Sequence, residues 1–204
     1  MNYTFKKILY DPLLIIDWLL GSIALKYYTF RSKIVAHNSV RVIGLPLIDI
    51  RGKSKVILGK DVVLRSRNRG YHINMLAPCK LMTDPNGSII IGDNSRIYGT
   101  CLHSSQGGII IGKNCLIASN VNIIDRNGHD MSMQNPEKRY ETIGAKNAHA
   151  VLIEDNVWIG ANCIITPGVT IGEGSVIMAN SVVNVDIPPK VLAGGVPSKV
   201  LKEY

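Results

Sequence analysis

The sequence predicts a mainly β fold, a solenoid of short strands, from three observations. Ile and Val account for 28 and 17 of the 204 residues, whereas Phe occurs only twice. β-branched side chains are stiff and pack well on a pleated surface, so this balance favours strands over helices. Aliphatic residues also recur with a spacing of six, and glycine follows many of them. A helix repeats about every 3.6 residues and a half-buried strand about every two, so neither explains this period.

The six-residue repeat fits coils whose short flat faces meet at tight turns. Each coil then stacks on the next and buries its hydrophobic face. The aliphatic side chain is expected to point into the core, and the small residue four positions later to fit at a corner. Cysteines at the small position are expected to be inert core thiols, because a buried free cysteine behaves as a small hydrophobe. The aliphatic positions include Ile91, Ile97, Ile111, Ile117, Ile123, Ile153, Ile159, Ile165, Ile171, Ile177 and Val183, and the small positions are Ser95, Cys101, Cys115, Cys163, Ser175 and Ser181.

A helix is expected near the N-terminus, over residues 12–28. Asp11 suits an N-cap, and Pro12 suits the first helical position. The apolar stretch Leu13–Leu25 rises about 20 Å as a helix, less than the roughly 30 Å core of a bilayer. A signal peptide rarely contains a carboxylate such as Asp17. The helix is therefore expected either to pack on the solenoid or to lie in a membrane interface.

The repeat is interrupted twice. Ile97 and Ile111 lie 14 positions apart rather than 12, and the glycine pair at 107–108 is expected to absorb the excess. A polar loop then covers residues 126–150. Loops of this length are usually either functional or disordered.

Three regions follow from these patterns. Residues 1–35 form an N-terminal helical, apolar segment, and residues 36–186 form the solenoid with its loop. The strand pattern ends at Pro188-Pro189. A helical tail is predicted over residues 187–204, where it would cover the open edge of the last coil.

Charge and cysteine content narrow the function classes. Residues 1–80 hold 14 Lys/Arg against 4 Asp/Glu, whereas residues 81–204 hold 9 against 11. A basic N-terminal part indicates an anionic partner, either a membrane surface or a phosphorylated ligand. Basic and aromatic residues do not interleave as they do in nucleic-acid-binding proteins, so no nucleic-acid partner is predicted. The four cysteines form no CxxC pair, which argues against zinc ribbons and thioredoxin-like motifs and fits a reducing cytoplasm.

Three longer motifs make the resemblance to a family specific. They are NVWIG at residues 156–160, ITPGVTIG at residues 165–172, and DIPP at residues 186–189 followed by AGGVP at residues 193–197. With the repeat, they resemble hexapeptide-repeat acetyltransferases over roughly residues 50–204, and they resemble the maltose, galactoside and surface-polysaccharide O-acetyltransferase branch closely. The resemblance implies a left-handed parallel β-helix. The period alone sets no hand, and the general rule for parallel crossovers would give the opposite one.

The resemblance implies a homotrimer with active sites between adjacent solenoids, acetyl-CoA as co-substrate and a catalytic histidine where the long loop leaves the coil. That position is His129. An imidazole can take the proton of a sugar hydroxyl and return a proton to the leaving thiolate. Asp125 and Asp130 are candidates to hold its tautomer. The family draws its oxyanion donors from backbone N–H groups near the VWIG turn, here Gly160 or Ala161.

The resemblance also assigns donor contacts. Trp158, Ala161 and Ala179 would line the pantetheine groove, together with Gly160. Lys199 and Lys202 fall where the family keeps basic residues near the phosphates of coenzyme A.

Acceptor contacts are less well matched. Related sugar acetyltransferases carry an acceptor-binding Asn in the coil before the glycine pair, and this sequence has none there. His103 or Ser104 is expected to take its place. His149 closes the loop and is expected to flank the site.

The predicted function is acetyl-CoA-dependent O-acetylation of a sugar in a bacterial surface polysaccharide (capsule, O-antigen or exopolysaccharide) or its precursor. The N-terminal helix and basic residues suit a lipid-linked acceptor, so a cytoplasmic protein with peripheral contact at the inner membrane face is expected. One alternative is N-acetylation of an amino sugar or small amine, and another is a non-catalytic binding solenoid. A γ-type carbonic anhydrase would need three zinc-binding histidines including an H-x4-H pair, which this sequence lacks. No metal is predicted.

Overall fold

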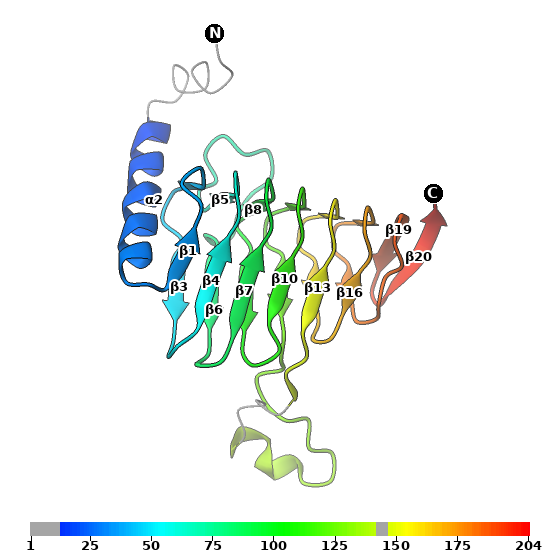
Figure 1. The fold of residues 1–204 in the computed structure, drawn as a ribbon. Helices are drawn as coiled ribbons and strands as arrows, with labels where there is room; N and C mark the ends of the chain where they lie inside the picture. Colours follow the sequence, from blue (N-terminus) through cyan, green and yellow to red (C-terminus); the bar gives the residue numbers. More distant parts are fainter. Residues whose placement is uncertain (1–12, 142–146) are drawn as a thin grey trace.

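The protein is a triangular solenoid with one helix across its N-terminal end (Figure 1). This computed structural model describes residues 13–141 and 147–204. Each coil contributes one strand to each of three faces in turn, and equivalent strands of successive coils pair in parallel. The predicted mainly β solenoid is therefore confirmed.

The three sheets are called faces A, B and C, in the order in which the chain visits them. Face A holds β1 (Ile34–Ala36), β4 (Lys55–Leu58), β7 (Ser88–Ile91), β10 (Ile109–Ile111), β13 (Val151–Ile153) and β16 (Thr170–Ile171). Face B holds β2 (Arg41–Ile43), β5 (Val63–Arg65), β8 (Arg96–Tyr98), β11 (Leu116–Ile117), β14 (Trp158–Ile159), β17 (Val176–Ile177), β19 (Val191–Gly195) and β20 (Ser198–Glu203). Face C holds β3 (Leu47–Ile50), β6 (Lys80–Thr83), β9 (Cys101–Ser104), β12 (Asn122–Ile124), β15 (Ile164–Ile165) and β18 (Val182–Val183).

The core is a set of stacked aliphatic columns. On face A, Ile91, Ile111, Ile153 and Ile171 pair in register and are buried. Each inward side chain therefore rests on the equivalent side chains of the coils before and after it. This stacking confirms the assignment of the six-residue repeat to inward-pointing positions.

The corners explain why Asn recurs in the repeat. Asn94, Asn114 and Asn156 turn the chain from face A to face B with φ between 56° and 62°, a left-handed conformation that Asn tolerates better than most residues. Their side-chain amides also form a ladder, in which Asn94 donates to Asn114 (2.9 Å) and Asn114 donates to Asn156 (3.2 Å). A second ladder, at the corner between faces B and C, joins Asn120, Asn162 and Asn180.

The corner assignment holds for two of the three cysteines and is wrong for Cys101. Cys115 and Cys163 are fully buried. Cys101 instead lies half-buried in β9. The inward residue that follows Ile97 is Leu102, five positions on rather than six, and it pairs with the inward Ile123. Cys101 is therefore shifted out of the corner position. Thr100 takes the small buried position and donates its hydroxyl to a backbone carbonyl.

The expected helix is α2 (Leu13–Phe30). The proposed cap at residues 11–12 lies outside the described residues. By length and composition α2 is able to cross a membrane, yet it packs on the first coil. Gly21 makes this contact possible, since a Cβ atom there would lie 2.2 Å from the carbonyl oxygen of Val42. Nearby, the buried Asp17 pairs with Arg67 at 2.7 Å.

The predicted C-terminal helix is wrong. The tail instead forms β19, which continues face B beside β17, and β20, which returns antiparallel to it. Val191 and Ala193 are buried, so the tail follows the two-residue period of a strand. The edge of face B is covered, as expected, but by a strand.

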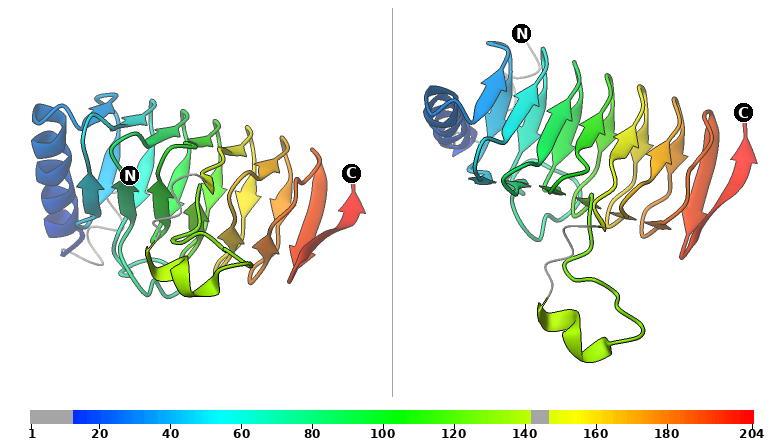
Figure 2. Two further views of the ribbon diagram at one scale, coloured as in Figure 1. Left: turned by 90° about the horizontal axis from the view of Figure 1, so that it is seen from below. Right: turned by 60° about the horizontal axis from the view of Figure 1, so that its bottom comes forward.

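Two segments leave the coils at corners. One is the predicted long loop, which follows β12 at the corner between faces C and A and includes the 3-10 helix η1 (Pro136–Glu141). It projects away from the solenoid (Figure 2). The other covers residues 66–79, between β5 and β6 at the corner of faces B and C. This second loop was not predicted, and the basic residues Arg67 and Arg69 belong to it rather than to a coil.

Candidate active site

A groove of about 630 Å³ runs along face B. Its lining includes Trp158, Gly160, Ala161 and Ala179, the four residues expected to bind the pantetheine. Small side chains keep the groove open and let the coils stack closely. At Gly160, a Cβ atom would lie 2.5 Å from the backbone nitrogen of Ala179. A largely apolar groove of this kind fits an extended chain such as the pantetheine arm.

Backbone hydrogen bonding at the VWIG turn distinguishes the two candidate oxyanion donors, Gly160 and Ala161. The Gly160 N–H already donates to the carbonyl of Ile177 at 2.8 Å. The Ala161 N–H, in contrast, has no acceptor within the described part of the chain. Of the two groups, only that of Ala161 is therefore available to a ligand in the groove.

His129 lies exposed on the long loop. Its Nδ1 atom is 2.9 Å from the backbone carbonyl oxygen of Arg139. A carbonyl only accepts hydrogen bonds, so Nδ1 carries a proton, and in the neutral ring the lone pair is then on Nε2. Such a tautomer is the one that a general base acting through Nε2 requires.

The two carboxylates proposed to orient His129 accept hydrogen bonds from other groups at the base of the loop and across it. Asp125 is fully buried, and its carboxylate accepts bonds from the Ser104 hydroxyl (2.9 Å) and from the N–H groups of Ser105 and Gly108 (both 2.7 Å). These bonds close the insertion in that coil. Asp130 accepts a bond of 2.8 Å from the side-chain amide of Asn147, across the loop.

The proposed acceptor residues cluster at the base of the loop. His103 Nε2 lies 3.6 Å from a carboxylate oxygen of Asp84, and Arg126 Nη2 lies 2.5 Å from the same oxygen. The Ser104 hydroxyl is buried and committed to Asp125. His149 is exposed where the loop rejoins the solenoid, and its N–H donates to the Asp125 carbonyl at 2.7 Å.

The predicted catalytic and donor residues lie on different sides of one chain. The loop that carries His129 leaves at the corner between faces C and A, which is opposite face B and its groove. Lys199 and Lys202 are on β20, at the C-terminal edge of face B. The Lys202 ammonium sits 4.4 Å from the ring centre of Tyr204.

The groove also contains aromatic residues that the sequence did not indicate. Tyr71 comes from the unpredicted loop and stacks on Tyr98 of β8, with ring centres 4.6 Å apart. Burial raises the pKa of the Tyr71 phenol. His72 and Arg96 complete this end of the groove. The loss of the six-residue spacing between Leu64 and Ile91 is the signal that could have indicated them.

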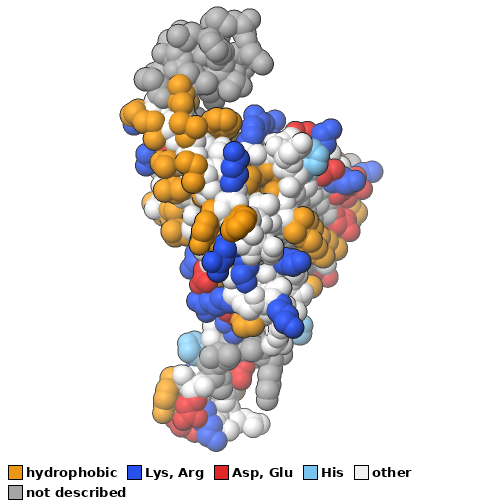
Figure 3. Space-filling model, turned by 60° about the vertical axis from the view of Figure 1, so that its left-hand side comes forward, with side chains coloured by type: hydrophobic (Ala, Val, Ile, Leu, Met, Phe, Trp, Pro, Cys, Tyr) orange, Lys and Arg blue, Asp and Glu red, His pale blue; other side chains and the backbone are white. Residues whose placement is uncertain are grey.

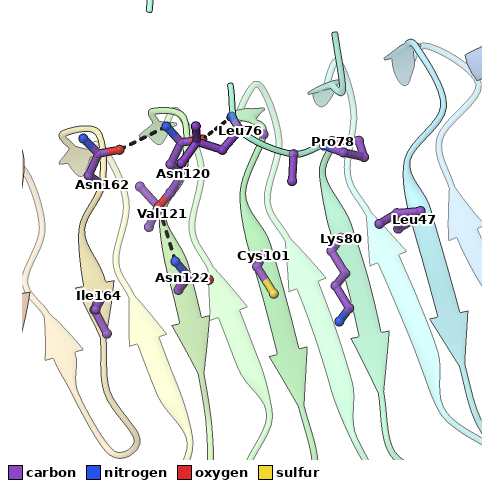
Figure 4. A pocket seen from close by; sticks show the side chains of 12 residues that line it. Leu47, Leu76, Pro78, Lys80, Cys101, Asn120, Val121, Asn122, Asn162 and Ile164 are labelled. Carbon is purple, nitrogen blue, oxygen red and sulfur yellow. Dashed lines mark hydrogen bonds between the residues drawn. The ribbon is translucent and has the colours of Figure 1, made fainter. Parts of the chain in front are cut away.

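A second cavity, of about 580 Å³, lies on face C (Figure 4). Lys80, Cys101 and Asn122 occupy successive strands along its floor. Leu76 from the 66–79 loop leans over it, and its N–H donates to Asn120 at 2.8 Å. The same loop thus borders the cavities on both faces. In the described part of the chain, no group of three or more His, Cys, Asp or Glu residues could hold a metal ion.

A solenoid of six-residue repeats with a groove of small residues defines the class of hexapeptide-repeat transferases, and comparisons with known proteins agree. The family described as bacterial transferase hexapeptide (six repeats) matches residues 150–184. The family described as hexapeptide repeat of succinyl-transferase matches residues 88–124. A Saccharomyces cerevisiae protein named as an acetyltransferase is 42% identical over 144 residues, covering 71% of this chain and 70% of that protein.

Two Escherichia coli proteins are similar over shorter stretches. A galactoside O-acetyltransferase is 43% identical over 47% of this chain and 44% of its own length. A protein named for O-acetyl transfer in lipopolysaccharide biosynthesis is 36% identical over 58% of this chain and 62% of its own length. The chain thus spans less than two thirds of each Escherichia coli relative.

Solved structures extend the likeness to the whole fold. A mutant N-acyltransferase from Bacillus cereus, in complex with dTDP and coenzyme A, matches with a TM-score of 0.62 and 25% identity over 83% of each chain. A hexapeptide-repeat acetyltransferase from Vibrio cholerae, in complex with acetyl-CoA, matches with a TM-score of 0.54 and 28% identity, over 88% of this chain and 76% of that one.

The chain belongs to the hexapeptide-repeat acetyltransferase family. Its coil is accordingly a left-handed β-helix, as the resemblance implied, and the protein is an acyltransferase that uses acetyl-CoA.

Proposed function

We propose that the protein transfers the acetyl group of acetyl-CoA to a hydroxyl group of a sugar in a bacterial surface polysaccharide (capsule, O-antigen or exopolysaccharide) or its precursor, with His129 as general base. The observation that carries this proposal is the contact between His129 Nδ1 and a carbonyl oxygen (2.9 Å), which in the neutral ring places the proton on Nδ1 and the lone pair on Nε2. The named O-acetyltransferases among the Escherichia coli relatives support a sugar hydroxyl as the acceptor.

In the proposed reaction one imidazole acts first as a general base and then as a general acid. His129 Nε2 removes the proton of the sugar hydroxyl as its oxygen attacks the thioester carbonyl. The oxyanion that forms accepts a hydrogen bond from the Ala161 N–H, which has no other acceptor in the described chain. When the C–S bond breaks, the imidazolium returns its proton to the leaving thiolate.

The proposed active site lies between subunits of a homotrimer. The long loop and the groove are on opposite sides of one coil, so His129 reaches a groove only if that groove belongs to a neighbour. Trp158 and Ala179 would contact the pantetheine, and Lys199 and Lys202 would bind the phosphates of coenzyme A.

Acceptor binding is proposed at the base of the loop, through His103 and His149. The polar groups of Asp84 and Arg126 beside His103 suit a hydroxyl-rich ligand, since each can exchange hydrogen bonds with it. Ser104 would act indirectly, because its hydroxyl holds Asp125. Both predicted carboxylates, Asp125 and Asp130, would fix the loop rather than touch the substrate.

A second candidate function is acyl transfer to an amino group. It is favoured by the Bacillus cereus relative, which is named an N-acyltransferase and matches over 83% of each chain. We also propose that the protein is cytoplasmic and makes peripheral contact with the inner face of the membrane through its N-terminal segment, where a lipid-linked acceptor would lie. The exposed apolar surface of α2 supports this contact.

Thiol release from acetyl-CoA tests the proposal. We expect release with oligosaccharides of a bacterial envelope and little release with amino sugars or simple amines. The His129→Ala variant is expected to lose about 10²-fold or more of this activity while keeping coenzyme A binding and its oligomeric state. Gln134→Ala, at an exposed position of the same loop, is the matched control. Full activity of His129→Ala would refute a catalytic role for this residue, and faster release with amino sugars would favour the second candidate.

A further inference from the structure

Helix α2 is apolar on the side that packs on the coil, where Leu25 and Tyr28 meet the core, and also on the side that faces outward. Asp17 and Gly21 are its two buried residues. The opposite side carries Ile16, Leu19, Ile23, Tyr27 and Phe30, spaced three or four residues apart and all exposed. Ile23 is 64% exposed and Phe30 is 86% exposed. A surface helix of a soluble protein instead carries polar and charged residues on its outer side. These five residues, called the outer stripe below, therefore indicate a partner that is itself apolar.

A groove with a basic rim lies directly beside the outer stripe. It has a volume of about 630 Å³ and runs between α2 and the first coil. Trp18 and Leu25 contribute apolar surface to it, whereas Lys26 and Arg41 contribute positive charge. Neither of these two cations has a hydrogen bond or ion pair within the described residues. The groove therefore offers two uncompensated positive charges at the border of an apolar surface.

The charge of this end of the molecule favours one kind of partner. Residues 13–80 hold 12 Lys and Arg against 3 Asp and Glu, a net charge of +9. Figure 3 shows this end, with apolar side chains along the helix and basic side chains bordering them. A second copy of the chain would bring the same positive charge against itself, which is repulsive. An anionic bilayer satisfies both features, because its acyl chains take up apolar side chains and its headgroups attract cations.

The orientation of α2 is also that of an interfacial helix. It lies across the end of the solenoid, along the strand direction and perpendicular to the stacking axis (Figure 1). A helix held this way can lie flat in the plane of a membrane while the solenoid stands away from it. If three solenoids stand side by side in the proposed trimer, three such helices lie at one end. Weak contacts of each helix then combine into stable binding.

We propose that α2 docks the protein on an anionic phospholipid bilayer. The outer stripe enters the boundary between headgroups and acyl chains, and the groove takes a lipid phosphate between Lys26 and Arg41. This inference rests on the peripheral membrane contact proposed above, and it names the surface and the lipid chemistry that make the contact. It does not depend on the identity of the acceptor sugar or on His129.

Sedimentation of the full chain with vesicles tests the inference. We expect binding to mixed phosphatidylcholine–phosphatidylglycerol vesicles at least about tenfold tighter than to phosphatidylcholine alone, and weaker binding as salt rises. Ile23→Ser with Phe30→Ser is expected to reduce binding to both kinds of vesicle. Lys26→Gln with Arg41→Gln is expected to remove most of the preference for the anionic vesicles. The control variant, Lys113→Gln with Lys190→Gln, removes the same amount of charge at exposed positions far along the coil. It is expected to keep the preference for anionic vesicles.

Several results would overturn the inference. They are equal binding of the wild type to both kinds of vesicle, an equal loss in the Lys113/Lys190 control, and binding of inorganic phosphate at the groove without vesicle binding. Concentration-dependent pairing of trimers that the Ile23/Phe30 variant abolishes, with no vesicle binding, would assign the outer stripe to a second copy. Acetyl transfer to a water-soluble sugar is measured in parallel. Vesicle binding with no transfer to any sugar would refute the proposed function alone, and normal transfer without vesicle binding would refute this inference alone.

Discussion

At the scale of single residues, the ion cluster at the loop base joins three parts of the protein. Asp84 follows β6, His103 belongs to β9, and Arg126 begins the long loop. The side chains of Asp84 and Arg126 are only 14% and 12% exposed. A charge pair this sheltered from water is costly to break, because one buried charge remains without its partner. The cluster therefore fixes the direction in which the loop leaves the solenoid.

The Asp84→Asn substitution tests this role. We expect a loss of about 3 kcal/mol in the free energy of unfolding, since Arg126 loses its carboxylate partner, and a fall in acetyl transfer because the loop is displaced. Asp49→Asn is the matched control, because the pair of Asp49 with Arg51 is about half-exposed on both sides and should contribute under about 1 kcal/mol. Arg51 also lies 3.6 Å from Asp84, and this second contact stays in place in the control. Denaturant unfolding measures both changes. Equal losses in the two variants would contradict a special role for Asp84.

A second residue-scale prediction concerns the buried thiol of Cys79. Burial raises its pKa, and the thiol donates a hydrogen bond of 3.1 Å to the carbonyl of Arg65. In the unfolded chain this thiol loses its proton above about pH 8.5, whereas in the folded protein it keeps it. The folded state then binds more protons, so the thiol's contribution to stability is complete below that pH and declines as pH rises further.

We therefore expect the stability advantage of the wild type over Cys79→Ala to shrink between pH 8 and pH 10. The decline approaches about 1.4 kcal/mol per pH unit while only the unfolded thiol is ionised. Urea unfolding of both proteins across this range measures it. Cys101→Ala is the comparison, because burial also raises the pKa of Cys101 but that thiol is only half-buried. A constant difference between wild type and Cys79→Ala would show that the thiol ionises equally in the folded and unfolded states, and would contradict a raised pKa in the folded protein.

At the scale of elements, the sequence predicts whatever is periodic. The columns of Ile and Val can be predicted because every coil repeats the same inward position. The long loop can be predicted because it appears as a gap in that period. The prediction of a C-terminal helix is wrong because the strand character of this tail depends on a partner strand. β20 is extended only because β19 supplies its hydrogen bonds, and no local pattern states this.

In the candidate site, too, the periodic features can be predicted from the sequence and the non-periodic ones cannot. The donor groove follows from side chains that share one face of the repeat, so Trp158, Gly160, Ala161 and Ala179 were found together. Tyr71 was missed because it reaches the groove from a loop that interrupts the repeat. The contact that holds the His129 ring was also missed, since its partner is a backbone carbonyl, and a backbone group has no signature in a sequence.

Helix α2 yields a prediction at this scale. In an exposed helix, Gly→Ala usually adds about 1 kcal/mol of stability. At Gly21 the sign should reverse, because the added methyl group would lie 2.2 Å from the carbonyl oxygen of Val42 and push the helix off the first coil. We expect a loss of about 1–3 kcal/mol and a change in the fluorescence of Trp18 on the same helix. Gly128→Ala, where no atom lies within 4 Å of the new methyl group, should leave stability unchanged.

At the scale of the whole molecule, the solenoid separates what the reaction must bring together. The long loop leaves the solenoid on the side opposite the face that carries the groove. A rigid, closely stacked coil cannot bend to close that gap. Association of identical chains can close it, because a loop from one solenoid then lies against the groove of the next. A cyclic trimer repeats this contact three times and leaves no site incomplete.

Mixed oligomers test this arrangement directly. His129→Ala removes the base, and Ala179→Trp fills the groove at an exposed position, so each variant alone is expected to be inactive. If sites are shared, a trimer that contains both variants pairs an intact His129 with an intact groove at some interfaces. Random exchange of equal amounts then restores about a quarter of the wild-type sites. The measurement is thiol release after the chains are unfolded and refolded together. The same variants mixed without refolding should stay inactive, and inactivity after refolding into mixed trimers would mean that one chain supplies the whole site.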